Sequence, residues 1–292
     1  MSHVAYVNGR YVRHAEAAVH IEDRGYQFAD AVYEVIAVWN EKPVDYGAHI
    51  VRLQRSLREI GISAFPNPAV LTVIIKEVIR RNRLRCGSIY LQVSRGVAPR
   101  NHVFPSEKTS PSLVVTARYG IGPNDDQIKH GVRVSTEPDL RWGRRDIKSV
   151  GLLPNVLAKQ RAVEGGAYEA LLIDGDGTLT EATAANLWVL DQDKILRTRP
   201  LGPEILAGVT RETVLSITQS IGLTVIERPF SLEEVLAAQE VFLSGTTVFV
   251  LSIIQVNDAI IANGLPGSCA TQLRALYLEH LNNPPTDAWK IT

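Results

Sequence analysis

The chain has 292 residues, of which 45% are hydrophobic, and its 31 basic and 31 acidic residues give a formal net charge of +0. This is an ordinary globular composition, sufficient for one large or two medium domains. It excludes a strongly basic nucleic-acid footprint and a polybasic membrane patch, and no apolar run is long enough to span a bilayer.

The N-terminal half alternates short strands and helices. Residues 5–12 (AYVNGRYV) predict a hairpin, because Asn8-Gly9 suits a two-residue turn. Residues 30–40 (DAVYEVIAVWN) predict a strand. Residues 49–62 predict a helix with one apolar face that Gly61 ends, and residues 67–82 predict a second helix. Two further strands follow, joined by a polar loop over 97–112, which gives an α/β domain over residues 1–120.

Residues 121–131, rich in Gly, Pro, Asn and Asp, predict an interdomain linker. The region 132–292 again mixes strands and helices and predicts a larger C-terminal α/β pseudo-barrel domain. Its expected helices lie over 154–164, 210–222, 232–239 and 268–281, and its strands lie over 132–142, 168–200, 223–230 and 240–257. The tail 282–292 is expected to be loose.

The cysteines and the N-terminus narrow the cellular context. The chain has two cysteines, Cys86 and Cys269, whose separation fits no zinc-binding or redox motif. Two cysteines this far apart also exclude a small fold held together by disulfides. The first twenty residues hold no apolar signal core, so a cytosolic protein without a membrane or nucleic-acid partner is expected. No dinucleotide-binding, Walker A, zinc-protease or nucleophile-elbow motif occurs.

Several polar residues are candidates for a site, each with an ordinary structural alternative. Lys148 lies between Ile147 and Ser149, where a strand gives way to a helix, although a lysine stem commonly lies along apolar surface. The stretch 208–210 precedes a helix and suits a phosphate, but Thr210 is equally explained as an N-cap.

The other candidates lie on helices, turns and loops. Arg52 lies on its helix and Glu181 follows a hairpin, and both are ordinarily explained as solvent-exposed charges. The turn 244–247 offers hydroxyls and backbone amides, although it is equally explained as a plain turn. The loop 95–104 carries Arg100 and His102, and arginine can bind a carboxylate with two hydrogen bonds, but an exposed basic loop is the simpler explanation.

Taken together, five stretches resemble the D-amino acid aminotransferases, which are fold type IV enzymes dependent on pyridoxal 5′-phosphate. The resemblance runs in order from about residue 4 to residue 258 and rests on EDRGYQFADAVYEV (22–35), DIKSVGLLPNVLAKQ (146–160), YEALL and TLTEATAANLWV (168–189), ILAGVTRE (205–212) and FLSGTT (242–247). It implies an α/β fold of two domains with the active site at their interface, and a homodimer.

The resemblance also implies roles for particular residues. Lys148 matches the lysine that binds the cofactor covalently and then moves the substrate proton, and an amine nucleophile works only when neutral. Glu181 matches the carboxylate at the pyridine nitrogen. The phosphate ligands match Arg52, Val209, Thr210 and Thr246, and the trap for the substrate carboxylate matches Tyr33, Arg100 and His102. In the family, the last two belong to the neighbouring subunit.

The sequence departs from the family where many relatives have serines. Ala182, Ala184, Ala185 and Gly245 carry no hydroxyl, so fewer hydroxyl contacts to the cofactor region are expected. The predicted reaction transfers an amino group from a D-amino acid such as D-alanine to a 2-oxo acid such as 2-oxoglutarate by a ping-pong mechanism. The alternatives are a branched-chain L-amino acid or (R)-amine transaminase, an aminodeoxychorismate lyase, or a non-catalytic carrier of the cofactor.

Overall fold

The computed structural model describes residues 3–63 and 67–283. Contacts between residues divide the chain into two units. Among the described residues, unit 1 consists of those up to Ile121, Ile147–Gly151, Asn282 and Asn283, and unit 2 consists of Gly122–Asp146 and Leu152–Leu281. The predicted tail lies outside the described residues from position 284 onward.

Unit 1 is built on a six-stranded sheet in the order β2-β1-β6-β5-β3-β4, counted over the described residues. Its strands are β1 (Val4–Val7), β2 (Arg10–Arg13), β3 (Ala31–Trp39), β4 (Lys42–Pro43), β5 (Gly87–Ser94) and β6 (Ser112–Tyr119). Its helical segments are η1 (His14–Glu16), α1 (Arg24–Phe28), α2 (Tyr46–Glu59) and α3 (Pro68–Asn82). The hairpin β1–β2 turns at Asn8 and Gly9, both with positive φ, as the sequence predicts.

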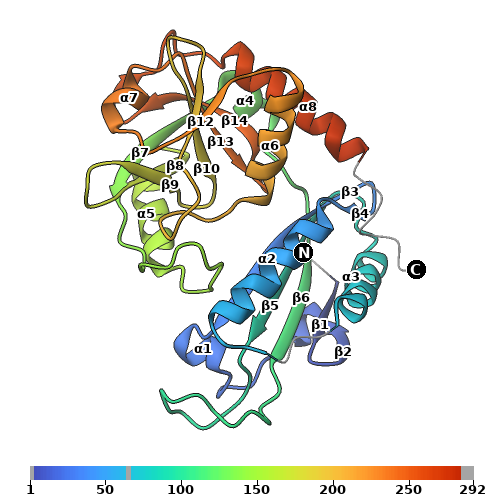
Figure 1. Cartoon of the computed structure of the whole chain (residues 1–292). Helices are drawn as coiled ribbons and strands as arrows, with labels where there is room; N and C mark the ends of the chain where they lie inside the picture. The colour runs from blue at the N-terminus through green and yellow to red at the C-terminus, as the bar shows by residue number, and fades with distance from the viewer. Residues whose placement is uncertain (1–2, 64–66, 284–292) are drawn as a thin grey trace. The chain divides into compact units, whose positions relative to one another are not determined.

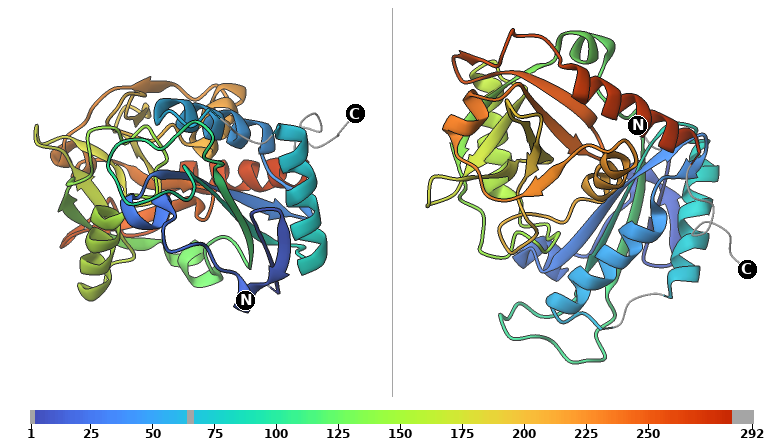
Figure 2. Two further views of the ribbon diagram at one scale, coloured as in Figure 1. Left: turned by 90° about the horizontal axis from the view of Figure 1, so that it is seen from below. Right: turned by 45° about the horizontal axis from the view of Figure 1, so that its top comes forward.

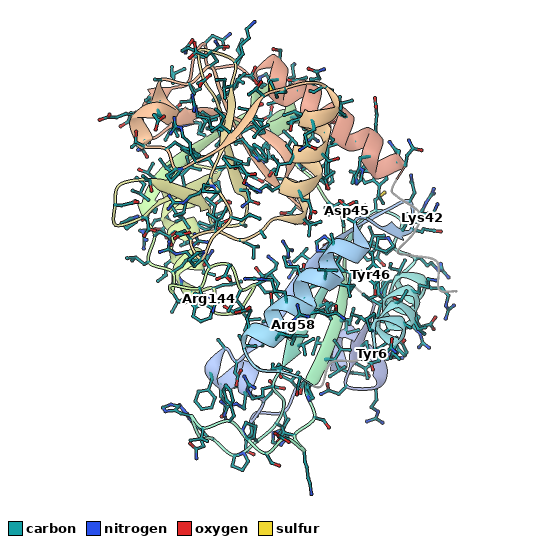
Figure 3. The ribbon with its side chains drawn as sticks, in the orientation of Figure 1. Tyr6, Lys42, Asp45, Tyr46, Arg58 and Arg144 are labelled. Carbon is teal, nitrogen blue, oxygen red and sulfur yellow. The ribbon has the colours of Figure 1, made fainter. Side chains whose placement is uncertain are left out.

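The core of unit 1 lies between its two long helices and one face of the sheet (Figure 1). Alternate residues of β3, such as Val32 and Ile36, are fully buried on this face. Leu53 of α2 and Ile75 of α3 are buried in the same cluster. The two helices are also joined by a hydrogen bond of 2.9 Å between Tyr46 Oη and Thr72 Oγ1, and Figure 3 labels Tyr46 near the start of α2.

Unit 2 is built on a mixed sheet whose nine strands, among the described residues, follow the order β12-β11-β10-β13-β14-β7-β8-β9, with β15 beside β14. The strands are β7 (Val132–Pro138), β8 (Glu169–Ile173), β9 (Leu179–Ala182), β10 (Asn186–Leu190), β11 (Leu196–Thr198), β12 (Val225–Glu227), β13 (Glu240–Gly245), β14 (Phe249–Val256) and β15 (Ala259–Ile260). The helices are α4 (Asp125–His130), α5 (Leu153–Glu164), α6 (Val209–Ser220), α7 (Leu232–Leu236) and α8 (Ser268–Asn282).

Unit 2 has a large apolar cluster on its sheet and a smaller one between α5 and β8. Residues of β7, β9, β10 and β13, such as Val134, Leu179 and Leu243, are buried in a single cluster. The end of β9 turns into the start of β10 through a hydrogen bond from Ala182 N to Ala185 O (2.8 Å). Helix α8 lies alongside the strands of this sheet (Figure 2). It packs on β14, where the Tyr277 and Phe249 rings have their centres 5.7 Å apart.

The observed units differ from the expected domain boundaries in two places. Ile147–Gly151, expected within the domain 132–292, groups with unit 1 because its backbone pairs with β3. The expected linker 121–131 contains α4, which begins with a capping box in which Asn124 and Gln127 bond reciprocally. No helix among the described residues is both long and apolar enough to cross a membrane.

Candidate active site

Lys148 lies on a short extended segment beside β3. Tyr33 N donates to Lys148 O (3.0 Å), and Val150 N donates to Ala31 O (3.1 Å). Because side chains alternate along an extended chain, Ile147 enters the core of unit 1 while Lys148 does not. The Lys148 ammonium lies 4.3 Å from the centre of the Tyr33 ring. The apolar neighbours of this lysine thus belong to the core, and its amine is directed to an aromatic ring.

Arg52 is buried on α2 beside a carboxylate of β3. Its Nε and Nη2 donate to the two carboxylate oxygens of Glu34 at 2.8 Å and 2.7 Å, and His49 Nδ1 lies 2.7 Å from Glu34 Oε2. Burial alone would raise the pKa of Glu34, but Arg52 and His49 lower it to about 2. Arg52 is therefore a fixed, charged side chain rather than one on a solvated face.

Helix α2 also contacts the lysine segment. Lys148 N donates to Ser56 Oγ at 3.4 Å, and Ser56 is fully buried. Ser56 follows Arg52 by four residues, so both side chains lie on the same face of α2. One helix face therefore holds the arginine and supports the backbone of Lys148.

Glu181 is buried in unit 2, with 4% of its surface exposed, although glutamates after hairpins are usually solvated. Its carboxylate accepts from Arg141 Nη1 at 2.5 Å, from Asn186 Nδ2 at 3.0 Å and from the Leu206 amide at 3.2 Å. Burial raises the pKa of Glu181, while Arg141 and the Leu206 amide act in the opposite direction. Arg141 thus favours the ionised form of this carboxyl group, against the effect of burial.

Arg141 is a residue that the sequence analysis missed. Its Nε and Nη2 donate to the two oxygens of Asp139 at 2.9 Å and 2.7 Å, which directs Nη1 toward Glu181. Thr180 Oγ1 donates to Asp139 Oδ2 at 2.7 Å. Arginine and glutamate are forty positions apart, so no local spacing reveals the pair. The available signal was a pair of opposite charges two positions apart, Asp139 and Arg141, just after the end of β7.

The start of α6 is tied to the same carboxylate. The N-cap is Gly208, and not Thr210, so the cap alternative for Thr210 is wrong. A Cβ on Gly208 would lie 1.9 Å from Asn186 Oδ1, and Asn186 donates to both Glu181 and the Leu206 carbonyl. Thr210 is buried in the first turn, where backbone amides lack intrahelical partners.

Thr246, Arg100 and His102 lie apart from these contacts, whereas Tyr33 adds a second ring to its contact with Lys148. Thr246 is half-buried in the turn between β13 and β14. Arg100 and His102 are exposed on the loop after β5, where both contact the Phe28 ring. Tyr33 stacks on Tyr90 with ring centres 5.6 Å apart. The structure thus joins Lys148 to Tyr33 in unit 1, and in unit 2 it joins Glu181 to the loop that precedes Val209.

Comparison with known proteins identifies the class. Residues 31–256 match the family model of class IV amino-transferases, and the chain belongs to this family. It is 41% identical over 260 residues to the D-alanine aminotransferase of Bacillus licheniformis, covering 89% of this chain and 90% of that protein. The identity to the D-alanine aminotransferase of Listeria monocytogenes serotype 4b is 36% over 276 residues, covering 94% and 95%.

A solved structure gives the same fold. The T.th. branched-chain amino acid aminotransferase with pyridoxamine 5′-phosphate superposes with a TM-score of 0.88 at 25% identity, covering 99% of this chain and 97% of that one. The fold is therefore that of the fold type IV aminotransferases, as the sequence predicts. Class IV aminotransferases use pyridoxal 5′-phosphate, and this is the cofactor of the chain.

The residues of each unit fit this cofactor chemically. In unit 2, the buried Glu181 carboxylate suits a protonated pyridine nitrogen, and the amides at the start of α6 suit a phosphate. In unit 1, Lys148 offers an amine for the aldehyde, and Arg52 offers a fixed guanidinium for the phosphate. Each unit therefore holds groups whose chemistry suits a part of this cofactor.

Proposed function

We propose that the chain is a D-amino acid transaminase that transfers the amino group of D-alanine-like substrates to 2-oxoglutarate by a ping-pong mechanism. The observation that carries the proposal is the pairing of Lys148 with Tyr33, whose ring lies 4.3 Å from the lysine amine. Tyr33 is one of three residues that match the substrate-carboxylate trap of D-amino acid aminotransferases. The D-alanine aminotransferases at 36–41% identity support the same assignment.

Each residue has a distinct task in this proposal. When bound, pyridoxal 5′-phosphate supplies an electron sink for negative charge at the substrate Cα. Lys148 Nζ removes the Cα proton of the donor amino acid, and in the second half of the ping-pong cycle it gives a proton to the Cα of the amino acid formed from the 2-oxo acid, since it is a base already held in place. Glu181 presents a negative charge that Arg141 maintains. Arg52, Val209, Thr210 and Thr246 bind the phosphate.

The trap residues set the handedness of the substrate. Arg100 binds the α-carboxylate with two parallel hydrogen bonds, and Tyr33 and His102 each add one. A carboxylate held on the Tyr33 side turns the Cα–H of a D-amino acid toward Lys148 and that of an L-amino acid away. We further propose a cytosolic homodimer in which Arg100 and His102 serve the partner subunit.

A comparison of donors tests the proposal. D-alanine, L-leucine and (R)-1-phenylethylamine are offered with 2-oxoglutarate to the wild type, Arg100→Ala and Lys108→Ala, the last being an exposed basic residue of the same loop. We expect D-alanine to be the best donor and to lose at least about tenfold in kcat/KM in Arg100→Ala, because a charge-assisted pair is removed. L-leucine as the best wild-type donor, or equal losses for D-alanine and the amine, would assign the enzyme to another transaminase class.

A further inference from the structure

The loop that carries Arg100 and His102 is fixed at its base by the segment before α1. Arg24 N donates to Gly96 O at 2.9 Å, Ala98 N donates to Glu22 O at 3.3 Å, and Asp23 forms an antiparallel bridge with Val97. Beyond this base, the chain from Pro99 to Pro111 forms no helix or strand, so these residues have no strand partner. The position of Arg100 and His102 must therefore be set by side chains.

Arg24 supplies the main side-chain anchor. The residue is 3% exposed, its Nε donates to Asp30 Oδ2 at 2.8 Å, and its Nη1 donates to the carbonyl of Asn101 at 2.5 Å. The same nitrogen lies 3.5 Å from the carbonyl of Val103. Asn101 stands between Arg100 and His102, so Arg24 holds the backbone at the centre of the predicted trap.

The Phe28 ring completes this anchor. The Arg24 and Arg100 guanidinium carbons each lie 4.8 Å from its centre, and the His102 ring lies 5.4 Å away at an interplanar angle of 69°. The aromatic face attracts cations, and the edge-on histidine contact is a favoured geometry. One turn of α1 thus binds the loop backbone through Arg24 and both trap side chains through Phe28.

A second arginine secures the far side of the loop. Arg95 donates to both oxygens of Asp30 at 2.7 Å and 2.9 Å, and its guanidinium carbon lies 3.6 Å from the centre of the Phe104 ring. Arg24 and Arg95 lower the pKa of Asp30, which therefore stays ionised between them. The shared carboxylate links the two anchors, so the loop is held on both sides of His102.

We infer that Arg24 is a positioning residue for substrate recognition, acting through Asn101 and Phe28 to orient Arg100 and His102 toward the α-carboxylate. The inference rests on the proposed function, because it gives the loop its substrate group. Lysine cannot reproduce these contacts, because its three N–H donors are on one rotating nitrogen, whereas Arg24 uses Nε for Asp30 and Nη1 for the Asn101 carbonyl. Arg24→Lys keeps the charge and tests the geometry alone.

The experiment compares D-alanine with D-alaninamide, which lacks the carboxylate, in holoenzyme of the wild type and Arg24→Lys. We expect kcat/KM for D-alanine to fall about tenfold, mostly through KM, with D-alaninamide nearly unchanged. Amide hydrogen exchange over residues 97–105 should accelerate about tenfold, as an anchored segment opens more often. Arg81→Lys is the matched control, because Arg81 also pairs with a carboxylate (Glu77, 2.7 Å) and lies over a ring (Tyr11, 4.4 Å).

Phe28→Leu is the second variant and decides the matter if Arg24→Lys does not fold. It keeps the backbone anchor and removes the ring, so a selective loss of D-alanine activity is again expected. Equal losses for the two substrates, or unchanged kinetics and exchange, would overturn the inference. Arg100→Ala separates the two hypotheses: if it does not discriminate between D-alanine and D-alaninamide, the proposed trap fails. If Arg100→Ala selectively loses activity with D-alanine while Arg24→Lys and Phe28→Leu do not, the proposed trap stands and only the positioning role of Arg24 fails.

Discussion

Lys148 shows how one residue is placed by its neighbours. Tyr33 and Ala31 hold its segment through backbone bonds, Ile147 anchors it in the core, and Ser56 supports its amide. Each of these contacts holds the backbone of the segment. The amine of Lys148 is not bound by them and lies against the Tyr33 ring. A nucleophile on a backbone held in this way loses less conformational freedom at the moment of reaction.

The first prediction concerns the covalent attachment of the cofactor. Borohydride reduction of the holoenzyme followed by peptide mapping should find the pyridoxyl group on Lys148. Lys159 serves as the internal comparison, because its ammonium also lies over a tyrosine ring (Tyr168, 4.6 Å) but hydrogen-bonds to Glu169 at 3.2 Å. A label on Lys159 would contradict the assignment.

The second prediction concerns the pair of Arg141 and Glu181. Burial raises the pKa of Glu181 and Arg141 opposes that effect, so Arg141→Met should raise it further. We expect the acidic limb of the kcat–pH profile to move upward by about one unit or more, because the carboxyl becomes protonated at higher pH.

Glu181→Gln is the matching variant without a titrating group. Its kcat should fall at least about a hundredfold at every pH, as expected when a charge aimed at the reacting group is lost. Cofactor absorbance checks that the ring is still bound. Glu169→Gln, a second buried glutamate of unit 2, should leave turnover nearly unchanged. Full activity in Glu181→Gln would show that its carboxylate has only a structural role.

At the scale of elements, the sequence pattern predicted the helices and turns that are determined by residues close together in the chain. The apolar spacing of residues 49–62 predicted α2, and Asn8-Gly9 predicted the first hairpin, both of which the structure contains. The helix α4 was missed because its polar, glycine-flanked sequence is typical of a linker. The short α1 was missed because five residues show no period, although its N-cap Asp23 was a signal.

The third prediction concerns how the stability of the fold depends on pH through His49 of α2 and Glu34 of β3. Burial lowers the pKa of His49 from 6.5, so between pH 6.5 and this lower pKa the unfolded chain binds a proton that the folded chain does not. Stability should therefore fall as pH drops below 6.5, by at most about 1.4 kcal/mol per pH unit for this group. Glu34, with a pKa of about 2 against 4.5, adds a further loss below pH 4.5.

Urea unfolding followed by circular dichroism between pH 7.5 and 5 measures this slope. His49→Gln removes the group that titrates near 6.5, so its stability should depend less on pH over this range than that of the wild type. His130→Gln is the control, because His130 is an exposed histidine near Asp126 (3.8 Å). Equal slopes in wild type and His49→Gln would mean that another group governs acid unfolding.

At the scale of the whole molecule, the predicted site residues divide between the two units. The resemblance assigned roles to both sets from motifs alone, and the comparisons confirm the family and the cofactor. The ion pairs that support those residues were not predicted. Glu34 with Arg52 and Arg141 with Glu181 join residues 18 and 40 positions apart. Such pairings depend on how helices, strands and loops pack together, which periodicity does not encode.

The last prediction tests the homodimer through complementation. If Arg100 serves the partner subunit, a mixed dimer of one Lys148→Ala chain and one Arg100→Ala chain contains one intact site, formed by Lys148 of one chain and Arg100 of the other. Each homodimer of a single variant has no intact site. Random reassociation makes half of the dimers mixed, so D-alanine activity should return to about a quarter of the wild-type value.

The control for this experiment pairs Lys148→Ala with Glu181→Gln. Both residues are proposed to bind the same cofactor molecule in one chain, so the mixed dimer has no intact site and activity should stay at the level of the separate variants. Size-exclusion chromatography with light scattering establishes that the variants are dimers and exchange subunits. If exchange occurs and the first pair regains no activity, Arg100 acts within its own chain, and the carboxylate trap must be assembled from a single subunit.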